Sequence, residues 1–144
     1  MRRSLCLFAL FVLGLPCQHA AAQARQEGDS REMRDTLPER VARRSFDAYV
    51  RKDLDASFAN YDTVFTHEYL GDPAGPKRIR REDWLRQAKN NAVIPTLRFE
   101  IVRLDVFGAF VTVIWVSRTP DGNEIKHFDL FEVRHGKFVR EIES

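Results

Sequence analysis

The chain has 144 residues, with 23 Lys and Arg against 21 Asp and Glu and a formal net charge of +2 at pH 7. A chain of this length fits one domain with a single hydrophobic core. Because the basic and acidic residues are nearly equal in number, nucleic acid or an anionic membrane surface is not expected to be the main partner.

The first 24 residues have the features of a secretory signal peptide. Arg2 and Arg3 precede an apolar run from Leu5 to Leu15, and the triplet 22–24 supplies the small residues of a cleavage site. The apolar run is shorter than the roughly 20 residues that span a bilayer. We therefore expect cleavage after residue 24 and a soluble mature protein, periplasmic or secreted, that makes no membrane contact.

Both cysteines lie inside this segment, at Cys6 and Cys17, so the mature protein would have no disulfide. Leu15 and Pro16 stand before Cys17, where a lipidation signal places a small residue. Lipid attachment at Cys17 is therefore the less favoured alternative.

Residues 25–35 are rich in charge and hold only Met33 as a large apolar side chain, which is typical of a flexible leader. The folded domain is expected over residues 36–144. Its first helix would start with a capping box between Thr36 and Glu39 and run to about Lys52. One face of this helix is built for burial and consists of Val41, Ala42, Ser45, Phe46, Ala48 and Tyr49.

A second, shorter helix would follow, with Asp53 as its cap and Asp62 as its end. Residues 63–69 then alternate like a strand. This alternation places Phe65, His67 and Tyr69 on one side.

Two glycines and two prolines predict a loop over residues 70–76. The mixed charges of residues 77–83 indicate the solvated start of a third helix. This helix, over residues 81–90, would press Trp84, Leu85 and Ala88 inward.

The rest of the chain predicts four strands joined by short connections, which is typical of an antiparallel meander. The expected strands are Leu97 to Asp105, Ala109 to Arg118, Glu124 to Arg134 and Lys137 to Glu143. The second of them is apolar on both faces and so needs a cover on both. Three helices can cover one face, and we expect a second copy of the chain on the other, which predicts a homodimer.

This order of elements resembles the nuclear transport factor 2-like superfamily, the fold of SnoaL-like polyketide cyclases and ketosteroid isomerases. The resemblance covers about Thr36 to Ser144. It rests on "DLDASFANY" from Asp53 and on "DLF" from Asp129 followed by "GKF" from Gly136. It implies a cone-shaped, cystatin-like α+β fold in which three N-terminal helices pack on a curved, mainly antiparallel sheet, with a pocket between them. It implies no single reaction, because the fold hosts enzymes, carriers and dimerisation modules.

The resemblance also places residues. His67 lies near the position of the catalytic aspartate of ketosteroid isomerases, if two residues are deleted between Tyr61 and Thr63. Asp129 lies near the acid that donates a hydrogen bond to the oxyanion in those enzymes. Where they carry a tyrosine on the first helix, this chain has Ser45. That difference argues against ketosteroid isomerisation itself.

His67 and Asp129 are the catalytic candidates. An imidazole titrates near neutral pH and can act as a general base, whereas the structural alternative for His67 is a buried ring bonded to a backbone carbonyl. An aspartate on an apolar face can stay protonated and donate a hydrogen bond, or can orient a histidine. The structural alternative for Asp129 is an ion pair with Arg140 or Arg118, and both alternatives stay open.

Aromatic and polar side chains on these elements are candidate ligand contacts, because apolar pockets with a few polar groups are lined in this way. The candidates are Tyr49, Phe65, Tyr69, Trp84, Trp115, His127 and Phe131. Core packing is the alternative for this set, and for Trp115 the dimer face is a further one.

The sequence lacks the motifs of several other chemistries. Its His and acidic residues, among them Glu68 and His135, do not have the spacing of a zinc site, so we expect no metal. The expected mature chain has no cysteine and no Gly-x-Ser-x-Gly motif, which argues against a covalent nucleophile. It has no Gly-rich phosphate loop either, so we expect no cofactor.

Together these features predict an exported domain whose apolar pocket binds a small hydrophobic organic molecule. If it is an enzyme, we expect cofactor-free proton transfer of the isomerase, dehydratase or cyclase type. His67 would then be the base and Asp129 the hydrogen-bond donor or orienting group. Two alternatives remain: a carrier that binds without reacting, and a homodimeric interaction module whose pocket is filled by its own phenylalanines.

Overall fold

Residues 37–144 are described by the structure, a computed structural model. Their elements are α2 (Pro38–Val50), α3 (Leu54–Phe58), β1 (Tyr61–Tyr69), β2 (Lys77–Arg80), α4 (Arg81–Asn90), a 3₁₀ turn (Ile94–Thr96), β3 (Arg98–Phe107), β4 (Phe110–Arg118), β5 (Glu124–Arg134) and β6 (Lys137–Glu143). The expected signal peptide and leader lie outside the described residues. None of the described helices is long and apolar enough to cross a membrane.

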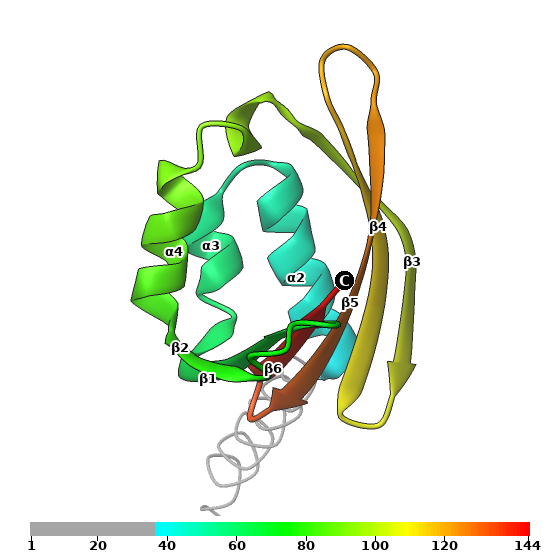
Figure 1. Cartoon of the computed structure of the whole chain (residues 1–144). Coiled ribbons are helices and arrows are strands. Elements are labelled where there is room, and N and C mark those ends of the chain that lie inside the picture. The colour runs from blue at the N-terminus through cyan, green and yellow to red at the C-terminus, as the bar shows by residue number, and fades with distance from the viewer. Residues whose placement is uncertain (1–36) are drawn as a thin grey trace, which may run out of the picture. The chain divides into compact units, whose positions relative to one another are not determined.

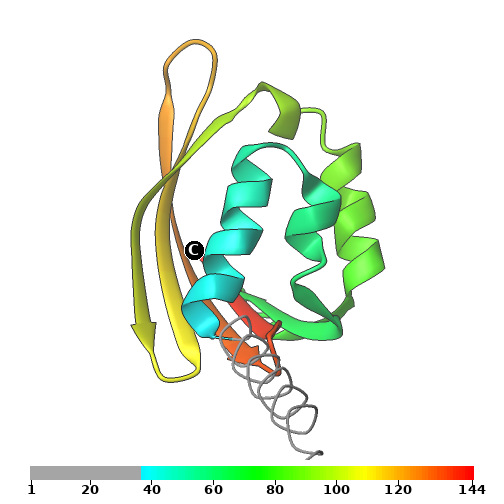
Figure 2. The same cartoon turned by 180° about the vertical axis from the view of Figure 1, so that it is seen from behind.

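The six strands form one sheet in the order β2-β1-β6-β5-β4-β3. Neighbouring strands pair antiparallel, except that β1 and β6 run parallel. The sheet curves strongly, and α2, α3 and α4 all lie on its concave side (Figures 1 and 2). The predicted α+β fold, with three helices on a curved and mainly antiparallel sheet, is confirmed.

The first helix, α2, begins with Pro38, which suits a first turn that needs no backbone donor. Leu37 occupies the N-cap position and makes no side-chain cap, and Thr36 of the expected capping box lies outside the described residues. The predicted burial of one face is confirmed for Val41, Ala42, Ser45 and Ala48.

The second helix, α3, has the predicted cap, because Asp53 Oδ1 accepts a hydrogen bond from the backbone N–H of Ala56 at 3.0 Å. The third helix, α4, covers the predicted residues 81–90. The residues before it are not a helix start, however. They form the short strand β2, in which Ile79 lies opposite Phe65 of β1.

The core fills the space between the helices and the concave face of the sheet. Phe131 of β5 and Phe138 of β6 pack with ring centroids 4.4 Å apart, and Phe46 of α2 meets Phe131 edge-on at 5.6 Å. Burying such side chains stabilises the fold by roughly 1.5–3 kcal/mol each. Farther along β5 and β6 from their shared hairpin, the concave face carries the acidic side chains of Asp129, Glu141 and Glu143.

The convex face of the sheet carries exposed apolar side chains. Phe110 is 42% exposed and Phe128 is 37% exposed. Phe110 lies opposite Glu132, and Phe128 lies opposite Ile114. Both phenylalanines alternate with residues that face the helices, so they lie on the other side of the sheet. No helix within residues 37–144 covers this side of the sheet (Figure 1).

Candidate functional site

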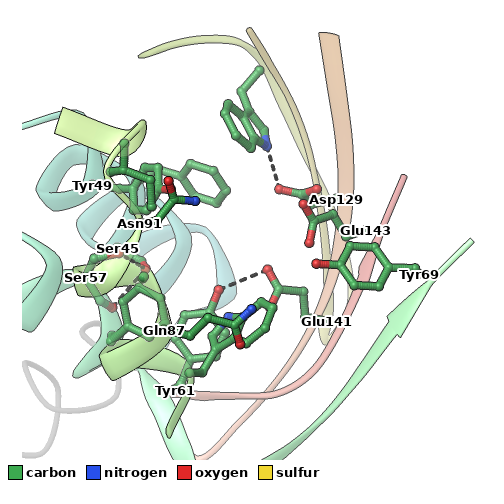
Figure 3. Close-up of a pocket in the computed structure, with 16 residues that line it drawn as sticks. Ser45, Tyr49, Ser57, Tyr61, Tyr69, Gln87, Asn91, Asp129, Glu141 and Glu143 are labelled. Carbon is green, nitrogen blue, oxygen red and sulfur yellow. Dashed lines mark hydrogen bonds between the residues drawn. The ribbon is translucent and has the colours of Figure 1, made fainter. Parts of the chain in front are cut away.

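A cavity of about 220 Å³ lies between the helices and the concave face of the sheet (Figure 3). Its lining residues are Ser45, Phe46, Tyr49, Ser57, Phe58, Tyr61, Tyr69, Trp84, Gln87, Ala88, Asn91, Ile94, Trp115, Asp129, Glu141 and Glu143. Small-molecule pockets commonly measure roughly 300–1,000 Å³, so this cavity is suited to a small ligand.

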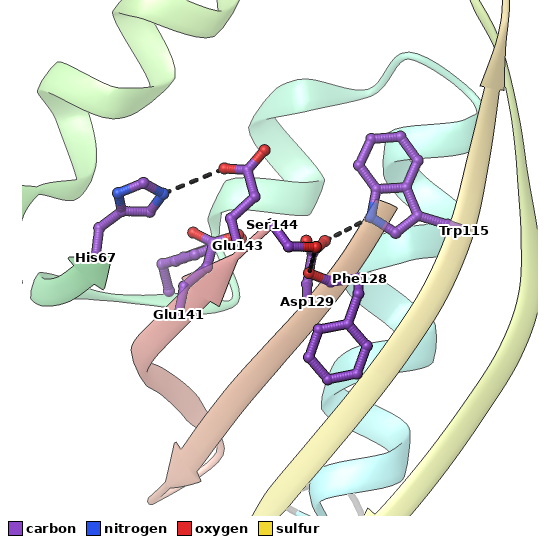
Figure 4. Close-up of polar contacts among 8 residues, drawn as sticks. His67, Trp115, Phe128, Asp129, Glu141, Glu143 and Ser144 are labelled. Atoms are coloured by element: carbon purple, nitrogen blue, oxygen red, sulfur yellow. Dashed lines mark hydrogen bonds and ion pairs between the residues drawn. The ribbon is translucent and has the colours of Figure 1, made fainter. Parts of the chain in front are cut away.

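Three carboxyl groups meet on the sheet side of the cavity: Asp129 from β5, and Glu141 and Glu143 from β6 (Figures 3 and 4). Glu143 is the register partner of Asp129. A register shift in the β5–β6 pairing brings Phe138 and Glu141 to the same concave face, although they are three residues apart. A β-bulge changes the direction of side chains in this way.

The two carboxyl oxygens of Asp129 have different surroundings. Oδ2 accepts a hydrogen bond from Trp115 Nε1 at 2.5 Å (Figure 4). Oδ1 has no hydrogen-bond partner in the described part of the chain, and it is buried, as is the whole residue, which is only 3% exposed. Burial raises the pKa of Asp129 from 3.8 to about 7, the Trp115 hydrogen bond opposes this rise, and the charge of Glu143 adds to it. Asp129 can therefore take up and release a proton near neutral pH.

The arginines that could have neutralised Asp129 are engaged elsewhere. Arg118 pairs with Glu100 and with Glu124, and Arg140 pairs with Glu68. The structural alternative for Asp129, an ion pair with one of these arginines, is therefore not what the structure contains.

Glu141 is 6% exposed and is likewise half satisfied. Its Oε1 accepts a hydrogen bond from the Tyr61 hydroxyl at 3.1 Å, whereas Oε2 is buried without a partner among the described residues. Burial, and then the charges of Asp129 and Glu143, raise the pKa of Glu141 well above its usual value of 4.5. Glu141 is therefore suited to hold its proton.

His67 lies one layer behind the cavity lining. It is 2% exposed, and the rings of Tyr69 and Trp84 cover it with centroids 4.6 Å from its own. Its Nε2 lies 3.3 Å from Glu143 Oε2, so its polar partner is a carboxylate and not a backbone carbonyl (Figure 4). His67 is not among the lining residues, and its contacts to the lining are those with Glu143, Tyr69 and Trp84.

The structure divides the predicted ligand contacts into two groups. Tyr49, Tyr69, Trp84 and Trp115 line the cavity. Phe65, Phe131 and His127 do not, because the first two are buried in the core and His127 lies behind Trp115. The rings of His127 and Trp115 stack with centroids 3.7 Å apart, and His127 Nε2 lies 2.9 Å from Ser117 Oγ.

The helical wall supplies polar groups that the sequence analysis did not select as ligand contacts. Ser45 Oγ donates to the backbone oxygen of Ser57 at 3.0 Å and so ties α2 to α3. Gln87 of α4 and Asn91, which directly follows this helix, line the cavity together with Trp84. The offset of three residues from Trp84 places Gln87 on the same helical face, a signal that was visible in the sequence.

The tyrosines of the site keep their protons. Burial, followed by the charges of Glu143 and other cavity acids, raises the pKa of Tyr49 and that of Tyr69 to about 12. The pKa of Tyr61 is raised well above 10, again chiefly by burial. Their hydroxyls are therefore hydrogen-bond donors at physiological pH.

Across residues 37–144 no three His, Cys, Asp or Glu side chains are arranged to hold a metal ion.

Comparison with known proteins identifies the family. The family model for SnoaL-like domains matches residues 42–141 of this chain, which therefore belongs to the SnoaL-like family. No curated protein matches the sequence significantly.

Solved structures share the fold at low identity. An NTF-2-like protein of unknown function from Burkholderia xenovorans is 21% identical, with a TM-score of 0.64 over 74% of this chain and 80% of that chain. A putative ketosteroid isomerase from Kribbella flavida is 20% identical, with a TM-score of 0.61 over 72% and 73%. An NTF2-like protein of unknown function from Mesorhizobium loti is 21% identical, with a TM-score of 0.62 over 74% and 88%. At these identities the likeness shows the fold alone, and the function must be argued from the site.

Proposed function

We propose that the cavity binds a small organic molecule and that Asp129 and Glu141 transfer protons to or from it without a cofactor. The observation that carries the proposal is the pair of buried carboxyl oxygens, Asp129 Oδ1 and Glu141 Oε2, that lack a partner among the described residues and belong to cavity-lining side chains. Leaving a buried polar group unpaired costs roughly 1–3 kcal/mol. Each oxygen has less than 1 Å² of accessible surface, so a ligand in the cavity would reach it after a rotation of the carboxyl group, and the new hydrogen bond would remove this cost.

Asp129 has the properties of a general acid or base. A pKa of about 7 lets the carboxyl exist in both forms at working pH, which is the condition for efficient proton transfer. The Trp115 N–H holds the carboxyl in place and leaves Oδ1 as the oxygen that can take the proton.

Glu141 complements this role as a hydrogen-bond donor. A carboxylic acid that stays neutral can stabilise negative charge that develops on a substrate oxygen. Tyr61 fixes its Oε1, so that Oε2 carries the available proton. His67, the base that the sequence suggested, would act on the substrate indirectly by holding Glu143.

The comparisons support the reaction class and no particular substrate. The Kribbella flavida protein of the same fold is described as a putative ketosteroid isomerase, and isomerisation is one of the reaction types that we propose. Ser45 stands where the resemblance to those enzymes calls for a tyrosine, so we propose an isomerase, dehydratase or cyclase acting on another small molecule.

Native mass spectrometry tests the binding step. The protein would be purified gently from the organism that makes it, and its mass compared before and after denaturation. We expect a retained small molecule that the double variant Asp129→Asn, Glu141→Gln retains at least tenfold less. The matched control is Glu132→Gln, which neutralises a carboxylate of the same strand on the opposite face of the sheet. An empty wild-type protein, or equal retention in the double variant, would contradict the proposal.

Deuterium exchange separates an enzyme from a carrier. The retained molecule would be incubated with the protein in D₂O and its mass followed with time. Proton transfer predicts incorporation of deuterium at carbon that falls at least tenfold in Asp129→Asn. A carrier predicts binding with no incorporation in any variant. A cavity of about 220 Å³ supports both over an interaction module with a filled pocket.

We also propose that the protein is exported and forms a homodimer. Residues 1–24 would act as a signal peptide, which N-terminal sequencing of the purified protein would test. The exposed Phe110 and Phe128 on the convex face support pairing with a second copy. In light-scattering measurements we expect a dimer whose dissociation constant rises at least tenfold in Phe128→Glu. A monomeric wild-type protein would contradict the dimer.

A further inference from the structure

The described walls of the cavity carry acidic groups that no basic group of the lining balances. Asp129, Glu141 and Glu143 contribute three carboxyl groups, and no Lys, Arg or His occurs among the described residues that line it. The nearest histidines that the contacts identify, His67 and His127, lie one layer behind the lining. Two of the three carboxyls are almost fully buried, so water screens their charge poorly.

Aromatic rings surround these acids. Trp115 lies beside Asp129, with which it shares a hydrogen bond, and Tyr49 meets the Trp115 ring edge-on at 6.3 Å. Trp84 and Tyr69 also line the cavity, and Tyr69 lies next to Glu143 (Figure 3). Faces of Trp and Tyr attract cations, and more strongly where water is excluded. Buried carboxyls flanked by aromatic rings suit a ligand that carries a positive charge and an apolar body.

We infer that the ligand of this cavity is a small aromatic or apolar amine, bound as its ammonium ion. The ammonium group would donate to the carboxyl groups of Asp129 and Glu141, which line the cavity, and its third N–H remains for Glu143 or water. The apolar body would lie against Trp84 and Tyr49. This inference rests on the proposed binding function and names the ligand class for the same site.

Other ligand charges fit the site less well. A carboxylate or phosphate ligand would add negative charge beside three acids that no lining cation balances. A neutral ligand could form hydrogen bonds to the carboxyl groups of Asp129 and Glu141, but only while both kept their protons or the ligand supplied donors. An ammonium ion supplies three donors and the opposite charge together.

The site also predicts how binding depends on pH. A bound cation favours the ionised form of nearby carboxyls, so it lowers the raised pKa of Asp129 and that of Glu141. Binding at pH 7 should therefore release protons, and the affinity for an amine should rise between pH 6 and pH 8. The other titratable groups that face or back the acids are Tyr49, Tyr61, Tyr69, His67, His127 and Glu143. The tyrosines titrate above this range, and burial lowers the pKa of His127, which favours its neutral form.

Fluorescence provides a direct test, because both tryptophans of the chain, Trp84 and Trp115, line the cavity. The protein expressed from its complete sequence would be titrated with three probes of similar shape: 2-phenylethylamine, neutral 2-phenylethanol and anionic 3-phenylpropionate. We expect the amine to bind at least tenfold more tightly than the alcohol at pH 7, and the anion to bind most weakly. The tenfold preference corresponds to about 1.4 kcal/mol.

Variants show whether the carboxyls cause the preference. In the double variant Asp129→Asn, Glu141→Gln, the ratio of the two affinities should fall to about one while the alcohol binds as before. The control variant Glu132→Gln should keep the wild-type ratio. Calorimetry in buffers of different ionisation enthalpy should show proton release only for the amine.

Several outcomes would overturn the inference. Equal affinity for amine and alcohol in the wild type would do so, as would an unchanged ratio in the double variant or no binding of the amine. None of these outcomes refutes the proposed function, which depends on a retained molecule in native mass spectrometry. A retained molecule without a basic nitrogen would overturn the amine class and leave binding itself supported.

Discussion

Replacing Asp129 by asparagine should change how the stability of the protein depends on pH. The Asp129 carboxyl has a pKa of about 7 in the folded chain and an ordinary value of 3.8. An acid whose pKa is raised on folding binds its proton more tightly in the folded state. It therefore stabilises the fold fully below pH 4 and loses this contribution progressively as the pH rises from 4 to 7.

The size of the effect follows from the two pKa values. They differ by about three pH units, and each unit corresponds to about 1.4 kcal/mol, so the loss between pH 4 and pH 7.5 is about 4 kcal/mol. Glu141, whose pKa is also raised, adds a loss of the same sign. An asparagine at position 129 does not titrate and can still accept the Trp115 hydrogen bond. It should remove the Asp129 part of the slope.

The assay is denaturant unfolding of the wild type and the Asp129→Asn variant at several pH values between 4 and 8. The difference between their free energies of unfolding should change by about 3–4 kcal/mol across this range, in favour of the variant at high pH. The Glu132→Gln variant should follow the wild type at a constant offset. Parallel curves for the wild type and Asp129→Asn would refute the claim that burial holds the Asp129 carboxyl near neutrality.

Three further predictions concern the elements that hold the site. Replacing Asp53 by alanine removes the cap on Ala56 of α3 and should lower the free energy of unfolding by about 1 kcal/mol, as measured in urea. Phe65→Ala leaves a hole in the core and should cost about 3–5 kcal/mol in the same assay, and a loss under 1 kcal/mol would contradict its burial. Tyr61→Phe removes the hydrogen bond that lowers the pKa of Glu141, so that pKa should rise further, as followed by carbon-13 NMR of the carboxyl group. An unchanged Glu141 titration would show that this hydrogen bond does not form in solution.

The parts of the fold that were predictable are those in which local pattern and tertiary packing agree. The bounds of β5, β6 and α4 match the sequence prediction, because glycine turns and helical periodicity mark them. The strand β2 was missed because only Ile79 of its four residues is apolar, and the pairing with β1 that makes it a strand is a contact beyond its own sequence. Tyr61 was predicted to lie in a helix but begins β1, because the strand pairing that holds it is also a contact beyond its own sequence.

The acidic end of the site was only partly predictable. Asp129 could be found because it interrupts an otherwise apolar face of β5. Glu141 and Glu143 could not, because strict alternation from Phe138 would place them on the face opposite the core, and the register shift that reverses this has no local signal. The cover of Trp84 over His67 likewise depends on how α4 docks on β1.

Carbon-13 NMR titration of the Asp129 carboxyl, with and without 2-phenylethylamine, tests whether this group titrates near neutrality and contacts the ligand. We expect a midpoint near pH 7 for the free protein and a lower midpoint when the amine is bound. A midpoint near 4 that the amine does not move would show that Asp129 is neither buried against the cavity nor in contact with what enters it.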